Sequence, residues 1–199
     1  MNKSRLEAFS DGVIAVIITI MVLELKAPDG ANLRAVAVLA PALLTYALSF
    51  VFVGIYWNNH HHMLHAVAHI DGAVLWANLH LLFWLSLVPF TTAWVGAHSA
   101  AALPTALYGV VLLLCGIAWL ALQRALLKLN GSNSALARAV GKDLKGRASA
   151  LLYSAAIGLA FVRTWMADAV YVLVALMWLL PDRRIERVIR SAEQDRGTE

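Results

Sequence analysis

The chain has 199 residues, of which 61% are hydrophobic and only 14% are charged, and its mean hydropathy is +0.71. A soluble domain has about 45–50% apolar and about 25% charged residues, so this composition excludes a soluble globular protein and indicates an integral membrane protein. The net charge of +4 does not indicate a nucleic-acid partner, because basic residues in membrane proteins more often report topology.

The apolar segments predict an all-α integral membrane protein with six transmembrane helices. A membrane-spanning helix needs about 20 mostly apolar residues. The predicted spans are residues 5–26, 35–57, 70–94, 101–123, 147–162 and 164–181. The fifth span is short, and Arg163 separates it from the sixth. Together the spans form one transmembrane domain, residues 1–181, and residues 182–199 form a charged tail.

The basic residues predict the orientation of the chain. Lys and Arg accumulate in the cytoplasmic segments of membrane proteins. With six spans and an inner N-terminus, all 16 basic residues except Lys26, Arg34 and Arg163 fall on the cytoplasmic side. We therefore expect the N-terminus, the C-terminus and the tail to be cytoplasmic.

The first predicted helix opens with the polar stretch SRLEAFSD. Ser4 followed three residues later by Glu7 is a capping-box pattern, which predicts a helix start at Ser4 and places Ser10 and Asp11 inside the helix. Alternatively, Ser10 or Asp11 is itself the N-cap. The local sequence leaves both interpretations open.

Helical periodicity sorts the residues that follow. At about 100° per residue, Val16, Ile20 and Leu23 lie on one apolar stripe, with Thr19 beside it. Asp11 points about 140° away from Val16 and therefore serves another surface. An ionisable residue at a membrane boundary normally has a partner. For Asp11 the candidate partners are Arg5 on the same helix and a histidine on another helix.

The end of the second predicted helix, YWNNHHHMLHAVAHID, holds five histidines: His60, His61, His62, His65 and His69. The spacing of His61 and His65 would allow both to bind a metal from one helical face. No cysteine is nearby and Asp71 is the only close carboxylate, so polar pairing is the preferred interpretation and no metal site is predicted. Tyr56 and Trp57 are typical of aromatic anchors at the membrane interface.

Two further features lie in the third predicted span. Asn78, His80 and Ser86 are expected to form interhelical hydrogen bonds, and Pro89 is expected to kink the helix. The whole sequence contains no TVGYG filter loop, Gly-rich phosphate loop, Ser-His-Asp arrangement or HExxH motif. We therefore predict no catalytic residue and no enzyme.

The pattern R-x-x-x-F-S-D, which begins at Arg5, resembles the signature of the endolysosomal potassium channel family and its bacterial homologues. The elements YWNNHH and NLHLLFWLSLVPF also resemble that family, as does the closing W-x-x-P from Trp178 to Pro181. The resemblance covers essentially the whole chain. The length is similar to that of the bacterial members, which carry one six-helix unit.

This resemblance implies a homotetramer in a bacterial inner membrane, with a central pore lined by the first helix. The chain carries one copy of the signature. Because one copy cannot enclose a pore, several subunits must contribute to it. Carried over from the family, the apolar rings fall on Val16, Ile20 and Leu23 and the pore-facing hydroxyl on Thr19. Related proteins carry isoleucine or leucine where this chain has Val16, so we expect a wider ring or weaker dewetting.

The resemblance also implies a polar network that holds the first helix against its neighbours without coordinating ions. Carried over to this sequence, the network consists of Arg5, Phe9, Ser10, Asp11, His60 and His61. Glu24 is expected to concentrate cations at the outer mouth. The expected function is passive potassium permeation without a carbonyl filter and without a cofactor, in contact only with lipid and other subunits. The alternatives are a proton-coupled cation or metal transporter that uses the histidine cluster, and a non-conducting scaffold.

Overall fold

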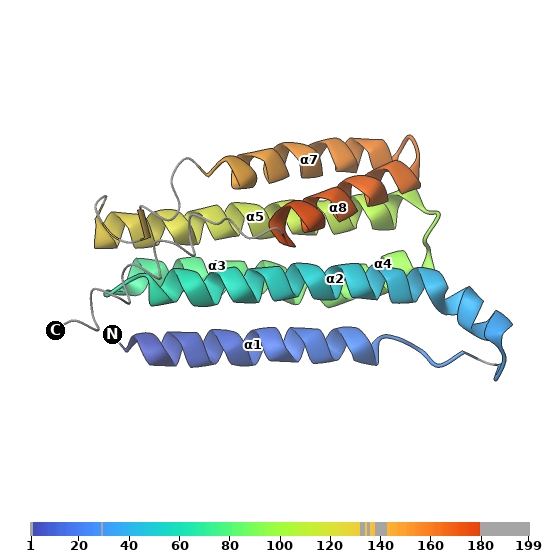
Figure 1. Cartoon of the computed structure of the whole chain (residues 1–199), viewed down its shortest axis with the longest axis horizontal. Coiled ribbons are helices and arrows are strands. Elements are labelled where there is room, and N and C mark those ends of the chain that lie inside the picture. Colours follow the sequence, from blue (N-terminus) through green and yellow to red (C-terminus); the bar gives the residue numbers. More distant parts are fainter. Residues whose placement is uncertain (1, 29, 132–133, 135, 138–142, 180–199) are drawn as a thin grey trace.

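The computed structural model describes residues 2–28, 30–131, 134, 136–137 and 143–179. These residues form helices and no strand, as the apolar segments predict. The helices run along a common long axis (Figure 1). They are α1 (Lys3–Leu23), α2 (Leu33–His65), α3 (Gly72–Ser86), α4 (Val88–Ala97), α5 (Ala102–Asn130), α7 (Leu144–Ala160) and α8 (Thr164–Leu179).

Four helical stretches in the described part of the chain are long and apolar enough to cross a membrane. They are α1, α2, the consecutive pair α3 and α4, and α5. Helices α7 and α8 have 17 and 16 residues and are therefore about 25 Å long, slightly shorter than a hydrocarbon core of about 30 Å. The chain is a multi-pass membrane protein, and each of the six predicted spans falls on one helix or on the α3–α4 pair.

The predicted helix ends are less accurate than the predicted helices. Helix α2 continues to His65 and α5 to Asn130, well past the expected ends at residues 57 and 123. The apolar pattern marks where a helix leaves lipid, whereas the backbone hydrogen bonds continue through the polar residues that follow. The predicted tail, residues 182–199, lies outside the described residues.

Proline interrupts the third predicted span. Helix α3 ends at Ser86 and α4 begins at Val88, with Pro89 in its first turn. Proline has no N–H to donate to the preceding turn, and its ring clashes with the carbonyl of the residue four positions earlier. The helix is therefore broken just before Pro89, which confirms the predicted kink. Pro41 lies inside α2, whose N-terminal end bends away from the bundle (Figure 1).

The start of α1 differs from both interpretations of its sequence. Asn2 is the N-cap, and its side-chain oxygen accepts a 3.0 Å hydrogen bond from the backbone N–H of Ser4. The capping-box prediction was wrong because asparagine caps helices as well as serine does and is available earlier in the chain. Ser10 and Asp11 lie inside the helix, which excludes them as N-caps. One carboxylate oxygen of Glu7 is buried without a hydrogen-bond partner among the described residues.

The buried apolar side chains form two clusters. One joins α1, α2, α3 and α5, and the other lies mainly between α5, α7 and α8. Small residues let α7 and α8 approach their neighbours closely; the buried ones are Ala156, Ala160, Ala167 and Ala175. On α5, a Cβ at Gly109 would overlap the hydroxyl of Tyr171, which donates a 3.0 Å hydrogen bond to the Thr105 carbonyl.

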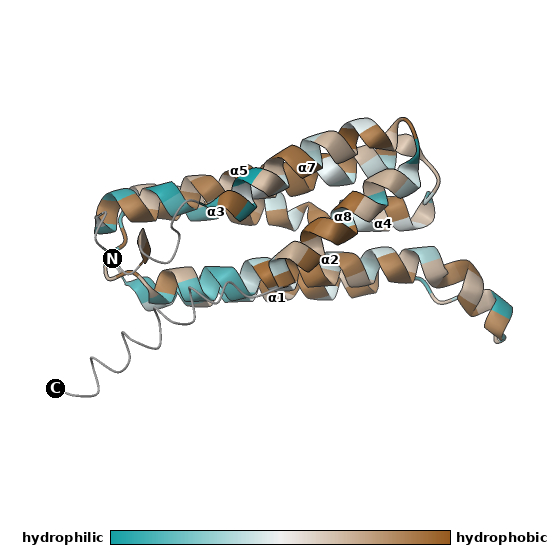
Figure 2. Cartoon of the chain, turned by 45° about the horizontal axis from the view of Figure 1, so that its top comes forward, coloured by the Kyte–Doolittle hydropathy of each residue, from teal (hydrophilic) through white to brown (hydrophobic). Residues whose placement is uncertain are grey.

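Helix α1 lies along one edge of the bundle (Figure 1). It packs against α2, α3 and α4, so only one of its sides faces the rest of the chain. Hydrophilic residues gather at the end of the bundle that holds the N-terminus, while the bodies of the helices are mostly hydrophobic (Figure 2). The other side of α1 is therefore an apolar surface that the single chain leaves uncovered.

Candidate functional site

The two sides of α1 carry different residues. The side facing the bundle holds Leu6, Ser10, Ile14, Ile17 and Met21, all buried. The opposite side holds all four residues predicted for the pore. Val16, Ile20 and Leu23 are 54%, 42% and 80% exposed, and Thr19 is exposed beside them. The structure therefore places the predicted stripe on the free face of an edge helix.

The exposed hydroxyl on this stripe is oriented by its own helix. Thr19 Oγ1 donates a 2.8 Å hydrogen bond to the Val16 carbonyl. Because the hydroxyl proton is donated within the helix, the lone pairs of the oxygen remain available to a hydrogen-bond donor or a cation. Glu24 ends the helix as its C-cap and is also exposed. The free face thus presents apolar side chains, one oxygen ligand and a carboxylate at its far end.

A buried polar network holds the other side of α1. Asn78 Nδ2 on α3 donates to Ser10 Oγ at 2.9 Å, and Ser10 Oγ donates to the Leu6 carbonyl at 2.8 Å. Asn78 Oδ1 accepts a 2.7 Å hydrogen bond from His60 Nε2 on α2. Ser10, His60 and Asn78 are at most 1% exposed. One asparagine therefore joins three helices, as expected for a polar residue inside a membrane bundle.

The hydrogen-bond partner of Asp11 is a tryptophan on α2. Its carboxylate accepts a 3.0 Å hydrogen bond from the indole Nε1 of Trp57 on α2. The expectation of Arg5 or a histidine as the hydrogen-bond partner was wrong. The rotation of α1 against α2 brings the indole, one turn before the histidines, opposite Asp11. Trp57 thus acts as a donor between helices as well as an aromatic residue at the end of the span.

The predicted six-residue network is only partly assembled within one chain. Ser10 and His60 meet through Asn78, and Asp11 meets Trp57, whose ring stacks on His61 at 6.2 Å between centroids. Arg5 and Phe9 are exposed on the free side of α1, and the Arg5 side chain makes no hydrogen bond to the described residues.

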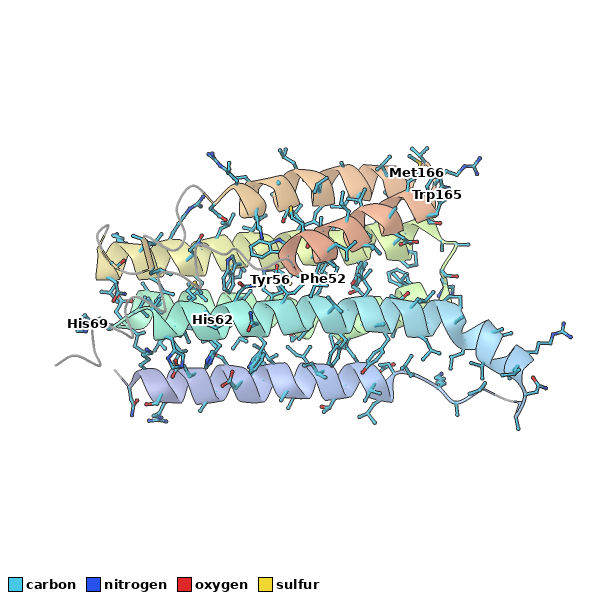
Figure 3. The ribbon with its side chains drawn as sticks, viewed as in Figure 1. Phe52, Tyr56, His62, His69, Trp165 and Met166 are labelled. Carbon is cyan, nitrogen blue, oxygen red and sulfur yellow. The ribbon has the colours of Figure 1, made fainter. Side chains whose placement is uncertain are left out.

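The remaining histidines of the cluster lie at and just beyond the end of α2. His61, His62, His65 and His69 are exposed, and the rings of His61 and His65 lie 4.3 Å apart. His62 projects from α2 and His69 lies just beyond its end (Figure 3). Within the described ranges, no three histidine, cysteine or acidic side chains are placed to share a metal ion.

The turn after α2 is held by a residue that the sequence did not single out. Asn130, the last residue of α5, accepts 3.1 Å hydrogen bonds from the N–H groups of Ala68 and His69 and donates to the His69 carbonyl. The local sequence around Asn130 did not predict this role, because its hydrogen-bond partners are 61 and 62 residues away in the chain. These bonds tie the end of α5 to the turn between α2 and α3.

These features define a class of protein: a multi-pass α-helical membrane protein whose first helix is anchored on one side and leaves an apolar stripe free on the other. Comparisons with known proteins specify the family. Residues 5–89 match the family described as endosomal/lysosomal potassium channel TMEM175. A potassium channel of Chryseobacterium sp. (strain P1-3) is 47% identical over 191 residues, which cover 96% of this chain and 100% of that one.

A solved structure supports the same assignment. The crystal structure of a lysosomal potassium-selective channel TMEM175 homolog from Chamaesiphon minutus superposes with a TM-score of 0.78 at 30% identity, over 89% of this chain and 96% of that one. The human endosomal/lysosomal proton channel TMEM175 is 36% identical over 73 residues, which are 31% of this chain and 14% of its own length. This chain belongs to the TMEM175 potassium channel family. The resemblance seen in the sequence is confirmed, and the protein is not an enzyme.

Proposed function

We propose that the protein forms a passive, potassium-permeable cation channel in which four copies surround a central pore lined by α1. The observation that carries this proposal is the exposed stripe of Val16, Ile20 and Leu23 on a helix whose other side is firmly anchored. Exposed apolar side chains on one face of an edge helix are compatible with lipid, with another subunit or with a dewetting pore. Membership of a channel family favours the pore.

In this proposal the narrowest ring is formed by Val16 from each subunit. Four aliphatic side chains constrict the path, so that a cation sheds part of its hydration or the pore dewets. The Thr19 oxygen, one turn away, replaces part of the lost hydration. No carbonyl filter takes part, and modest selectivity for potassium over sodium follows from the absence of a closely fitting oxygen cage.

The orientation proposed for the channel follows the positive-inside rule. Both termini lie in the cytoplasm of a bacterium whose inner membrane holds the protein. Glu24 then lies at the outer mouth, where its charge raises the local cation concentration. Neutralisation by Glu24→Gln lowers conductance at low ionic strength and has less effect at high salt, because the Debye length shrinks.

Flux into liposomes tests the proposal. Purified protein is reconstituted without a pH gradient, and uptake of a rubidium tracer for potassium is measured. We expect uptake by the native chain, and slower uptake by Val16→Ile because the larger side chain narrows the ring. Val22→Ile is the matched control, since Val22 is 47% exposed but lies about 120° from Val16 around the helix.

Two outcomes contradict the proposal. Uptake that occurs only with a pH gradient and saturates indicates the proton-coupled transporter. Equal effects of Val16→Ile and Val22→Ile place the conduction path elsewhere.

A further inference from the structure

The free face of α1 continues beyond the proposed pore residues toward the N-terminus. Phe9 is 53% exposed, and Arg5, one turn earlier, is also exposed. At about 100° per residue, these two side chains lie about 20° to either side of Val16 around the helix axis. Two residues that the resemblance placed in a structural network therefore lie in line with the residues proposed for the pore.

Arg5 is the charged residue that the N-terminal turns of α1 present on this face. Its guanidinium makes no hydrogen bond or ion pair within the described part of the chain. The other charged residues of these turns are directed toward the bundle. Lys3 Nζ donates a 3.2 Å hydrogen bond to a carbonyl in the turn after α2, Glu7 has a buried carboxylate oxygen, and Asp11 accepts the indole hydrogen bond from α2. The positive charge of Arg5 is therefore not balanced on the free face.

Glu24 places the opposite charge at the other end of α1. It is the exposed C-cap of the helix, and the helical rise of about 1.5 Å per residue separates it from Arg5 by about 28 Å along the axis. The Debye length is about 10 Å at an ionic strength of about 0.1 M, so each charge acts on the solution at its own end. Helix α1 thus exposes a cation at one end and an anion at the other.

From this arrangement we infer that Arg5 makes the channel rectify, so that the inward potassium current exceeds the outward current. The inference rests on the proposed function, in which four copies of α1 line the pore and the N-terminus is cytoplasmic. A ring of four guanidinium groups at the cytoplasmic mouth repels cations and lowers their local concentration, whereas the Glu24 ring raises it at the outer mouth. Fewer cations therefore enter from the cytoplasm, and the outward current is the smaller one.

Single-channel recording of the full-length protein in planar lipid bilayers tests the inference. Currents are compared at equal and opposite voltages in symmetric potassium chloride, and each channel is evaluated alone, so that random insertion does not average the two directions. At about 0.1 M salt, four charges about 10 Å from the axis should lower the outward current about threefold. At about 1 M salt, where the Debye length is about 3 Å, the two currents should be nearly equal.

Substitutions of Arg5 separate its charge from its shape. Arg5→Gln should raise the outward current about threefold at low salt, and Arg5→Lys should leave the current ratio of the native chain unchanged. On a Cys115→Ala background, Arg5→Cys modified by a cationic thiol reagent should regain the native ratio, whereas an anionic reagent of similar size should not. The cationic reagent should act from the side toward which the restored larger current flows, because that side is the cytoplasmic one.

A second pair of variants keeps Arg5 in place. Gly12 is exposed on the same face, about 40° from Val16 around the helix, and a Cβ there meets no atom within 4 Å. Gly12→Glu adds a ring of negative charges near the Arg5 ring and should raise the outward current about threefold, whereas the matched Gly12→Gln should not. This pair decides the outcome if the loss of Arg5 prevents folding.

The inference is overturned if the native currents are equal in both directions at low salt, or if Arg5→Gln and Arg5→Lys give the same current ratio. Equal effects of the cationic and anionic reagents would likewise leave Arg5 with a purely structural role. In each of these cases continued conduction leaves the proposed pore standing. If the native chain conducts no current, the proposed function fails and the inference fails with it.

Discussion

The indole Nε1 of Trp57 on α2 donates a 3.0 Å hydrogen bond to the carboxylate of Asp11 on α1. This contact fixes the rotation of α1 about its own axis, together with the buried Ser10 network on the adjacent side. With that rotation set, Val16, Ile20 and Leu23 point away from the bundle. The polar residues at the start of α1 therefore set the direction in which its apolar residues point.

Removing the indole donor should weaken the attachment of α1. Trp57→Phe keeps an aromatic ring but leaves Asp11 without its hydrogen bond, and we expect a loss of about 1–2 kcal/mol in stability. The apparent melting temperature in detergent, followed by far-ultraviolet circular dichroism, measures the effect. Trp76→Phe is the control, because Trp76 is 76% exposed. Equal melting temperatures for Trp57→Phe and the native protein would mean that the contact does not hold α1.

The buried asparagine should be more critical than the exposed indole. Asn78→Leu leaves His60 Nε2 without its partner and Ser10 Oγ without its donor, although Ser10 still donates to the Leu6 carbonyl, and unpaired buried polar groups cost about 1–3 kcal/mol each. We expect a loss of about 2–4 kcal/mol in the same melting experiment. Asn58→Leu, an exposed position on α2, controls for the substitution itself. A loss no larger than that of Asn58→Leu contradicts the role of this network.

The close approach of α8 to α5 makes Gly109 sensitive to a single methyl group. Gly109→Ala places a Cβ into the hydroxyl of Tyr171, and overpacking of this kind costs about 1–3 kcal/mol. Gly158→Ala has open space around its Cβ and should be stabilising by up to about 1 kcal/mol, because alanine favours a helix over glycine. Melting temperatures that shift in the same direction for both variants would be inconsistent with this packing.

The Thr19 hydroxyl should lower the barrier for a partly dehydrated cation. Thr19→Val keeps the shape and removes the oxygen, and we expect tracer uptake to fall about fivefold, equivalent to about 1 kcal/mol of barrier. Thr45→Val is the matched control, because Thr45 is partly exposed on α2 and its hydroxyl also donates to a carbonyl of its own helix. Unchanged uptake in Thr19→Val would exclude the oxygen from the ion path.

Features that depend on local periodicity were predictable from the sequence. The helices, the distortion at Pro89 and the division of α1 into two faces all follow from residue spacing and from the chemistry of proline. Partners across helices were not predictable in the same way. Asp11 could have met Arg5, a histidine or Trp57, and only the relative rotation of α1 and α2 selects the indole. The hydrogen bonds of Asn130 likewise depend on contacts between distant segments.

We propose that the free face of α1 faces the ions, and thiol modification tests this orientation most directly. The only cysteine, Cys115, is buried, and Cys115→Ala provides a background for single cysteines. We expect a water-soluble cationic thiol reagent to block rubidium uptake through Val16→Cys and Ile20→Cys, and to leave Val22→Cys unaffected. Modification of the cysteine at position 16, verified by mass, with uptake unchanged would contradict the account.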